Sequence, residues 1–243
     1  MTTANPPSSD QDRYAKLHQG VDAVARYKRK LDNRMDHLRD GIETGLLARW
    51  CRGNVLDCTV GVGRFIGRLP NVTRYDGMDL STEFVDHVRA AYPGTYVVTG
   101  DLLAGLPFPD ATYDSVLCLR SLSGIGHLST ILPEMVRVTR PGGLVVFDYG
   151  RKATVTQVKG VRTVLDDEDV DAAIATLDAQ LVERVHVDAF LTRVKARARL
   201  FRFLNGPRGR LVSDEVLLGL ERWMVPLMWQ RQIVVLRRNG VTA

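Results

Sequence analysis

The stretch that decides the fold is Val55-Leu56-Asp57-Cys58-Thr59-Val60-Gly61-Val62-Gly63-Arg64-Phe65. Its first part is an apolar run that ends in an acid, which predicts a buried strand over residues 55–58. Two glycines then mark a turn, and the apolar pattern that resumes after them predicts a helix over residues 65–69. Because glycine lacks a side chain, a ligand can approach the bare backbone of this turn, beside the expected helix N-terminus.

Two further predicted strands also end in an acid. Residues 75–80 contain Asp79 and residues 97–101 end in Asp101, so that these acids and Asp57 are evenly spaced along the chain. In a parallel sheet the ends of strands from successive βα units lie side by side. We therefore expect three carboxylates along one edge of one crevice.

The residues alone leave two classes of ligand open. A polar, positively charged ligand suits a row of carboxylates, whereas a phosphate group does not. A dinucleotide is the alternative, because Gly61, Gly63 and Gly67 could open its site and Asp79 could bind its ribose diol.

Four short segments, in a fixed order between about residues 53 and 150, narrow this choice. They are Val55–Gly63; Met78–Ser81; Gly100–Leu102 with Leu106–Phe108 and Tyr113–Val116; and Glu134–Gly143 leading into Leu144–Phe147. With these segments the chain resembles the class I S-adenosylmethionine-dependent methyltransferases, in particular the small-molecule branch similar to ubiquinone-type methyltransferases. The resemblance implies S-adenosylmethionine as the cofactor. Asp101 and the turn at residues 140–143 count against the dinucleotide.

The resemblance implies an α/β fold with a Rossmann-like, seven-stranded, mostly parallel sheet in the order 3-2-1-4-5-7-6. Strand 7 is expected to be antiparallel, between strands 5 and 6, with helices on both faces of the sheet. The pattern of residues predicts strands over residues 55–58, 74–79, 96–99, 114–119, 143–149, 182–187 and 232–236. It predicts two helices within residues 14–50 and further helices over 65–69, 82–91 with Ser81 as N-cap, 129–139, 169–181, 191–204 and 214–228.

We expect three parts along the chain. Residues 1–12 are polar and predict a disordered tail, and residues 13–52 predict a helical lid. Residues 53–243 form the expected methyltransferase domain, with a helical insertion at about 191–228.

The resemblance also implies how the nucleoside end of the cofactor is bound. Asp79, followed by Leu80, stands where the family has the acid that accepts both ribose hydroxyls. A carboxylate suits a diol because its two oxygens accept two donors at once. Asp101 stands where the family's acid meets the adenine amino group, and Leu102 offers its backbone amide to the ring.

The methionine end of the cofactor is expected beside the glycine turn. Asp57 lies near the amino-acid end, and Gly61 and Gly63 permit a close approach. Thr59 departs from the family pattern, because it stands where the family has the first glycine of the turn. Since a β-branched residue prefers negative φ, we expect a different turn there or a tighter pocket.

The acceptor side is defined by fewer residues. Methyl transfer needs mainly alignment and the exclusion of water, so a general base is optional. His127 stands where the resembled branch has a histidine that faces the acceptor and takes a proton, and a simple helix-start histidine is an equal alternative. Tyr14 and Tyr27 are candidates for closing a lid, or else they pack the N-terminal helices. The candidates for contact with the acceptor are Arg120, Tyr149 and Arg151, the last of which a surface position also explains.

The composition predicts one compact domain in a reducing compartment. Of the 243 residues 45% are hydrophobic, which is enough for a sizeable core. No apolar run is long enough to span a membrane, and residues 1–12 lack the apolar segment of a signal peptide. The three cysteines are scattered, which favours the cytoplasm over a disulfide framework. Neither they nor the five histidines show ligand spacing, so no metal is expected.

The charge pattern is a second functional clue. The formal net charge is +5, and residues 191–210 contain no acid. The basic residues there are Arg193, Lys195, Arg197, Arg199, Arg202, Arg208 and Arg210. A solvated helix face is the usual cause, and an anionic acceptor or an anionic membrane surface are the functional alternatives. Nucleic acid ranks below both, because no known module and no aromatic interleaving supports it.

The sequence therefore predicts a cytoplasmic methyltransferase that modifies an oxygen or nitrogen of a small, anionic or amphiphilic molecule, with a secondary metabolite as one candidate. Two alternatives stay open. One is a membrane-associated quinone or lipid methyltransferase. The other is a protein of the same fold that binds the cofactor without transfer, which Thr59 supports.

Overall fold

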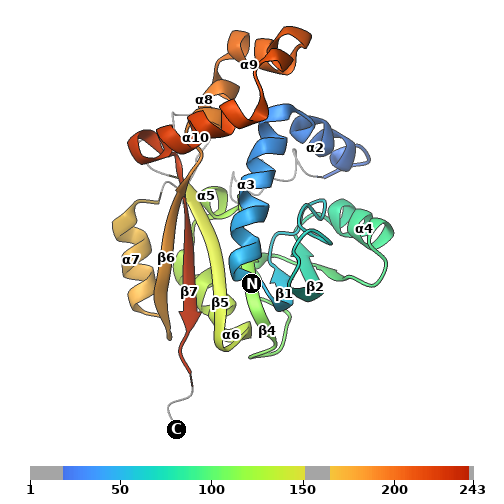
Figure 1. Cartoon of the computed structure of the whole chain (residues 1–243). Coiled ribbons are helices and arrows are strands. Elements are labelled where there is room, and N and C mark those ends of the chain that lie inside the picture. Colours follow the sequence, from blue (N-terminus) through green and yellow to red (C-terminus); the bar gives the residue numbers. More distant parts are fainter. Residues whose placement is uncertain (1–18, 151–164, 241–243) are drawn as a thin grey trace, which may run out of the picture.

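The computed structural model describes residues 19–150 and 165–240 (Figure 1). The predicted tail at residues 1–12, Tyr14 and Arg151 lie outside these ranges. A seven-stranded sheet runs through the molecule, with helices on both of its faces and a further group of helices beyond one end of its strands.

The sheet has the predicted topology. Its strands are β1 (Gly53–Asp57), β2 (Val72–Asp79), β3 (Tyr96–Thr99), β4 (Tyr113–Cys118), β5 (Thr139–Gly150), β6 (Ala179–Val187) and β7 (Arg231–Arg238). They are arranged in the order β3-β2-β1-β4-β5-β7-β6. Strands β1 to β5 pair in parallel, and β7 is antiparallel to both β5 and β6. Both the strand order and the antiparallel last strand are thereby confirmed.

The helices surround this sheet. They are α2 (Ala23–Leu31), α3 (Arg34–Trp50), α4 (Thr82–Ala91), α5 (Leu122–Ile125), α6 (Leu128–Val138), α7 (Asp167–Ala175), α8 (Phe190–Ala196), α9 (Ala198–Asn205) and α10 (Asp214–Met228), with short 3-10 helices η1 (Leu102–Ala104) and η3 (Pro207–Leu211). Ser81 caps α4 as predicted, because its hydroxyl accepts the N–H of Phe84 at 3.3 Å. Among the described residues, no helix is both long enough and apolar enough to cross a membrane.

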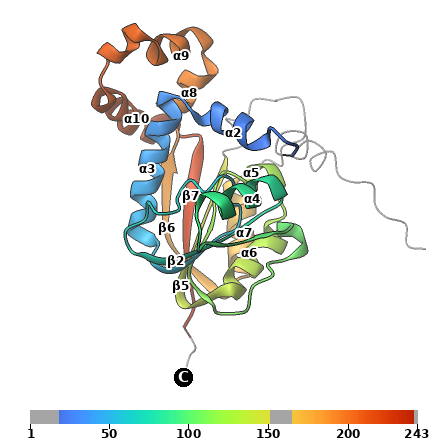
Figure 2. The same cartoon turned by 90° about the vertical axis from the view of Figure 1, so that its right-hand side faces the viewer.

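The core has two layers, one on each face of the sheet. Figure 2 shows α3 on one side of the strands and α6 and α7 on the other. Leu56 and Val116 pack on the side of α6 and α7, and their neighbours Val55 and Leu117 pack on the side of α3 and α4. Since successive residues of a strand point to opposite faces, the central strands are apolar on both.

Helices α8 to α10, residues 190–228, form a helical cap beyond the carboxyl ends of the parallel strands (Figure 1). Its core contains Leu191, Leu204 and Leu217, packed against Met35 of α3. The buried Glu221 joins α10 to the start of α8, because its carboxylate accepts the N–H of Ala189 at 2.7 Å and that of Leu191 at 2.8 Å. The insertion expected over 191–228 corresponds to this cap, although the helix predicted over 191–204 breaks at Arg197.

Two predicted helices differ from the structure. Residues 61–68 form successive turns in place of the helix expected over 65–69. The cause is backbone conformation, since Gly61, Gly63 and Gly67 all have positive φ, at 55°, 77° and 73°. The helix expected over 169–181 ends at Ala175, because the chain pairs with β7 from Ala179 onward.

Candidate cofactor site

Three acids lie at the ends of three neighbouring strands. Asp57 is the last residue of β1, Asp79 is the last residue of β2, and Asp101 closely follows β3. Because β1 pairs in parallel with β2, and β2 with β3, these three ends lie at the same edge of the sheet. Asp57 and Asp79 are buried, and Asp101 is half-buried. The structure therefore brings together the three acids that the sequence singled out.

Asp57 accepts two hydrogen bonds at a buried position. The hydroxyl of Tyr75 donates to its Oδ2 at 2.8 Å, and the N–H of Thr59 donates to its Oδ1 at 3.2 Å. Burial raises the pKa of Asp57 to about 6, against the opposing effect of the hydrogen bond from Tyr75. This carboxyl group therefore changes its charge close to neutral pH.

Asp79 fixes the position of the glycine turn relative to β2. The N–H of Gly61 donates to its Oδ2 at 2.9 Å, and the N–H of Ser81 donates to its Oδ1 at 3.0 Å. The carboxylate thus holds the turn on one side and the N-cap of α4 on the other. Leu80, between Asp79 and Ser81, is half-buried.

The glycines of the turn have different roles. A Cβ atom at Gly61 would have no neighbour closer than the carbonyl oxygen of Thr59, at 4.0 Å, so this part of the backbone faces open space. A Cβ atom at Gly63 would lie 2.7 Å from the ring of Tyr92, so Gly63 is required by packing. Gly61 therefore leaves the open approach that a ligand at the turn needs.

Thr59 fits the turn without strain. The described non-glycine residues with positive φ are Ala111, Arg120, His127 and Asp188. Thr59 keeps the negative φ that suits a β-branched residue. Its hydroxyl lies 3.9 Å from Sγ of Cys118 in β4, which directs the side chain toward the sheet.

Asp101 and Leu102 begin the 3-10 helix η1. Asp101 caps it, because its Oδ1 accepts the N–H of Leu103 at 2.9 Å. Leu102 is buried in the core on the side of α6. The preceding Gly100 must lack a side chain, because a Cβ atom there would lie 2.7 Å from Sδ of Met78. Asp101 thus extends the row of acids, and the residues on either side of it, Gly100 and Leu102, are closely packed.

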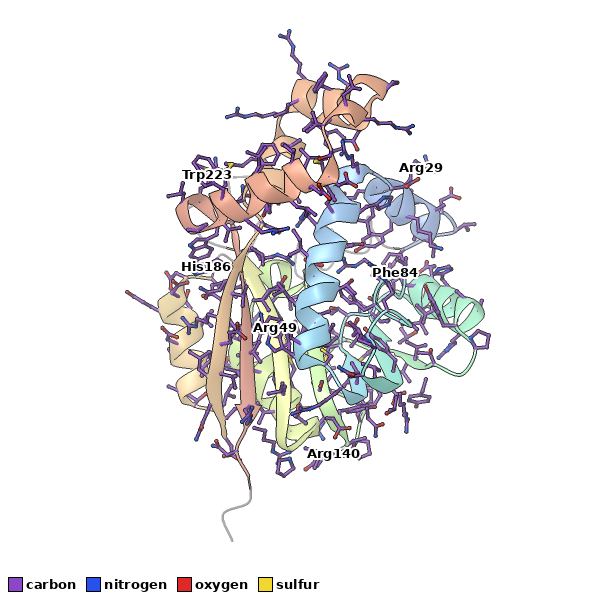
Figure 3. The ribbon with its side chains drawn as sticks, in the orientation of Figure 1. Arg29, Arg49, Phe84, Arg140, His186 and Trp223 are labelled. Carbon is purple, nitrogen blue, oxygen red and sulfur yellow. The ribbon has the colours of Figure 1, made fainter. Side chains whose placement is uncertain are left out.

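Tyr27 of α2 reaches this site from the N-terminal helices. Its ring packs on Phe84 of α4 with centroids 5.2 Å apart (Phe84 is labelled in Figure 3). Burial raises the pKa of Tyr27, and the charges that act on its hydroxyl belong to Arg64, Arg120, Asp79 and Asp40. Tyr27 is therefore near enough to the acid at the end of β2 and to two arginines for their charges to act on its hydroxyl.

Helix α3 carries an acidic stripe that sequence patterning alone does not single out. Asp36, Asp40, Glu43, Leu47 and Trp50 share one face of the helix, because they recur at steps of three or four residues. All of them are buried or half-buried. Acids at positions where a core-facing helix normally has apolar residues require buried cations as partners.

Two of the cations that pair with these acids are arginines, one from the glycine turn and one from the end of β4. Nη1 of Arg64 lies 2.6 Å from Asp40 Oδ1 and 3.2 Å from Glu43 Oε2. Nη2 of Arg120 lies 2.8 Å from the same two oxygens. The N–H of Arg120 donates to Asp148 of β5 at 2.7 Å, and its φ is 62°. The predicted acceptor residue Arg120 is therefore held within an ion cluster beside the site.

Arg231 of β7 completes the cluster at its buried centre. Its guanidinium binds Glu43 and Asp148, and its Nε lies 3.0 Å from Asp188 Oδ2. Although burial alone would raise it, the pKa of Glu43 is held well below its usual range by Arg231, Arg120 and Arg64. Burial outweighs Arg231 at Asp148 and raises the pKa of that carboxyl.

Two further residues predicted on the acceptor side occupy different surroundings. Tyr149 is fully buried, and its hydroxyl lies within hydrogen-bond distance of Asp167, at 2.7 Å, and of Gln232. Contact of Tyr149 with an acceptor would require these partners to move. His127 is exposed at the N-cap of α6, with φ 52°. Its role as a base stays a prediction.

Comparisons with known proteins match this geometry. Residues 56–147 match the family model described as "Methyltransferase domain". The match identifies residues 56–147 as similar to a methyltransferase domain, and it supports a relationship to the class I S-adenosylmethionine-dependent methyltransferases. S-adenosylmethionine is accordingly the cofactor of this domain.

Two curated relatives and one solved structure show how far the similarity extends. A "Probable S-adenosylmethionine-dependent methyltransferase" of Mycolicibacterium smegmatis is 34% identical over 44% of this chain and 42% of its own length. The demethylmenaquinone methyltransferase of Beutenbergia cavernae is 32% identical over 48% of this chain and 53% of its own length. The chain thus matches about half of each relative. A geranyl diphosphate methyltransferase solved with S-adenosylmethionine shares the fold, with 16% identity, a TM-score of 0.57 and coverage of 90% of this chain and 91% of its own.

The described residues also show what the site lacks. Within residues 19–150 and 165–240, no group of three or more histidine, cysteine or acidic side chains is placed to hold a metal ion. The acids at the edge of the sheet instead contact hydroxyl groups and backbone N–H groups.

Proposed function

We propose that this methyltransferase-family protein transfers a methyl group from S-adenosylmethionine to an oxygen or nitrogen of a small amphiphilic or anionic molecule. The observation that carries the proposal is the row of strand-end acids around a glycine turn whose backbone faces open space at Gly61. When bound, the cofactor supplies a methyl group activated by a positively charged sulfur. The remaining work of the protein is to orient two ligands and exclude water.

Different residues of the chain are suited to different parts of the cofactor. Asp79 is suited to accept the ribose hydroxyls, and Asp101 with the backbone of Leu102 is suited to the adenine ring. Asp57, which is ionised above about pH 6, is placed to attract the ammonium group of the methionine end. Tyr27 is proposed to close the site from the side of α2, in the lid role expected of residues 13–52, and its packing on Phe84 of α4 supports this.

Fewer observations support the proposed class of methyl acceptor. The relative named as a demethylmenaquinone methyltransferase supports an amphiphilic acceptor for this chain. His127 is exposed where it could take a proton from a hydroxyl or an amine. The buried free thiols of Cys51, Cys58 and Cys118 support the proposal that the protein works in the reducing cytoplasm.

Calorimetric titration tests the proposal. S-adenosylhomocysteine should bind to the wild-type protein, and NAD should not. Asp79→Asn should weaken S-adenosylhomocysteine binding at least tenfold, since it removes the charge that accepts the ribose hydroxyls. Asp86→Asn, at an exposed position of α4, serves as the control and should leave the affinity unchanged.

Each opposing result has a distinct meaning. Preferential binding of NAD would favour a dinucleotide site, and unchanged affinity in Asp79→Asn would overturn the ribose assignment. Tight binding of S-adenosylmethionine without methylation of any amphiphile in a panel of quinones, lipids and phenols would favour a protein that binds the cofactor without transfer.

A further inference from the structure

The helical cap displays large apolar side chains where a soluble helix normally has polar ones. On α10, Val216, Trp223 and Leu227 are 52%, 68% and 65% exposed. Together with the half-buried Leu220 they recur at steps of three or four residues, so they form one continuous row along the helix. The row lies beside the face of α10 that carries the buried Leu217 and Glu221. Helix α10 is therefore apolar on more surface than its packing uses.

The same cap is strongly basic. The chain has no acid from residue 189 to residue 213. The exposed arginines of the cap are Arg193, Arg197, Arg199, Arg202, Arg210 and Arg222. Of the acids in α10, Glu221 is buried and Asp214 pairs with Arg34 of α3 at 2.6 Å. Glu215 is thus the acid of the described cap that is both exposed and outside these contacts.

Two further large apolar side chains of the cap are exposed. Phe203 of α9 is 49% exposed, and Leu211 at the end of η3 is 89% exposed. Arg202 precedes Phe203 and Arg210 precedes Leu211, so that a cation accompanies each of these apolar side chains. Large apolar groups interspersed with arginines and nearly free of acids are typical of surfaces that lie in the interface of an anionic bilayer.

We propose that the helical cap binds the surface of an anionic membrane, with the apolar row of α10 inserted among the acyl chains and the arginines on the phosphate groups. Guanidinium groups bind phosphate oxygens in pairs, and a tryptophan prefers the boundary between acyl chains and headgroups. The proposal does not depend on methyl transfer, because it concerns the cap alone.

The position of the cap means that membrane binding would orient the rest of the protein. The cap stands beyond the carboxyl ends of the parallel strands, the edge at which Asp57 and Asp79 lie (Figure 1). Figure 3 shows Trp223 on α10, at the opposite end of the molecule from Arg140. A protein held to a bilayer by the cap would therefore turn the carboxyl ends of its parallel strands, where the cofactor site lies, toward the membrane. An amphiphilic acceptor could then enter the site from the bilayer.

Vesicle sedimentation with the full chain tests the proposal. The protein should sediment with vesicles that contain phosphatidylglycerol and should stay in solution with pure phosphatidylcholine vesicles. The double variant Trp223→Ala with Leu227→Ala should bind at least tenfold more weakly. Tyr96→Ala is its control, because Tyr96 is a 54% exposed aromatic residue on β3 at the far edge of the sheet.

The cationic part of the surface is tested separately. Arg199→Gln with Arg202→Gln should weaken binding about tenfold or more, because each basic residue near an anionic surface contributes about fivefold. Arg140→Gln, at the opposite end of the molecule, should have no such effect. Added salt should weaken the wild-type interaction as well.

Tryptophan fluorescence locates the contact. Of the three tryptophans, Trp50 is buried and Trp229 stacks on His186 with ring centroids 4.2 Å apart. The emission of Trp223 should therefore shift to the blue when anionic vesicles are added, and Trp223→Phe should lose the shift while the protein still binds.

Three results would overturn the proposal. One is sedimentation that is absent or that does not depend on anionic lipid. A second is equal binding by the wild type and by the Trp223 and Leu227 double variant, with both shown to be folded by circular dichroism. A third is a wild-type dimer that the double variant converts to a monomer, which would assign the row to self-association.

Discussion

At the scale of single residues, the pH dependence of stability at Asp57 is opposite in direction to that of an acid paired with cations, such as Glu43. The pKa of Asp57 is about 6 in the folded protein, against 3.8 for an ordinary aspartate. The folded state therefore binds a proton at Asp57 more tightly than the unfolded state does. The free energy of unfolding contributed by this group falls as the pH rises through this window, by about 3 kcal/mol in total.

Replacing Asp57 by asparagine should remove this dependence. Urea unfolding at pH 4 and pH 7 should show that Asp57→Asn gains about 2 kcal/mol of stability relative to the wild type as the pH rises. The acids whose pKa is lowered, Glu43 and Asp188, are common to both proteins and cancel in the difference. A difference between the two proteins that stays constant with pH would contradict the burial effect at Asp57.

The sequence predicts the place of Asp57 and leaves out its surroundings. An apolar run that ends in an acid fixes the end of a strand, and the family pattern places that end beside a ligand. The hydroxyl that donates to Asp57 belongs to Tyr75, on the neighbouring strand β2. Contacts across strands depend on register, which is known only when the sheet is assembled.

At the scale of elements, the turn after β1 tests strain and ligand approach separately. Gly61 and Gly67 both have positive φ, and a Cβ atom at either would meet no close neighbour. Alanine at each position should therefore lower the free energy of unfolding by a similar 1–2 kcal/mol, roughly the strain of a left-handed residue. Gly61→Ala should also weaken S-adenosylhomocysteine binding about tenfold, because its methyl group projects into the open space at the turn.

The matched variant Gly67→Ala should keep the affinity of the wild type. Thermal melts give the loss of stability and calorimetric titration gives the affinity. Equal weakening of binding in both variants would show that strain in the turn, and not the space at Gly61, controls the ligand.

The same turn shows why one helix was predicted wrongly. Val62, Phe65, Ile66 and Leu69 have helical spacing, and the pattern therefore favours a helix. All but Ile66 are buried, so the spacing did report packing correctly. Glycine permits both signs of φ, so the left-handed conformation that prevents the helix leaves no trace in the pattern.

Helix α3 illustrates the converse. Its existence followed from periodicity, whereas its buried face contains Asp36, Asp40 and Glu43. Acids normally indicate the solvated face of a helix, so their charge argues against burial until the partner arginines are known. The spacing that these acids share with Leu47 and Trp50 is the signal from which the stripe could have been found.

At the scale of the whole molecule, the central sheet was predictable, whereas the packing of the parts added to it was not. Apolar runs and turns predict the seven strands, and the family resemblance implies the order that the sheet has. The helical cap and the ion cluster depend on contacts between residues far apart in the chain, such as Glu43 with Arg231. Such charged pairs form no local pattern, and only the assembled fold shows them.

The ion cluster joins α3 to the glycine turn and to the ends of four strands, so its central charge should affect global stability. Glu43 contacts Arg64, Arg120 and Arg231, and it is almost fully buried. Removing one partner from a buried ion cluster leaves the others uncompensated. Glu43→Gln should therefore lower the free energy of unfolding by about 3–5 kcal/mol at pH 7.

The dependence of this effect on pH provides the sharper test. Because the folded pKa of Glu43 lies well below 4.5, the ionised carboxylate stabilises the fold above that pH, and this contribution is lost as the pH falls further. The advantage of the wild type over Glu43→Gln should thus shrink in acid. The control Asp86→Asn removes an exposed partner of Arg89 and should change stability by less than about 1 kcal/mol. If Glu43→Gln unfolds in urea at the same midpoint as this control, the cluster does not hold α3 against the sheet.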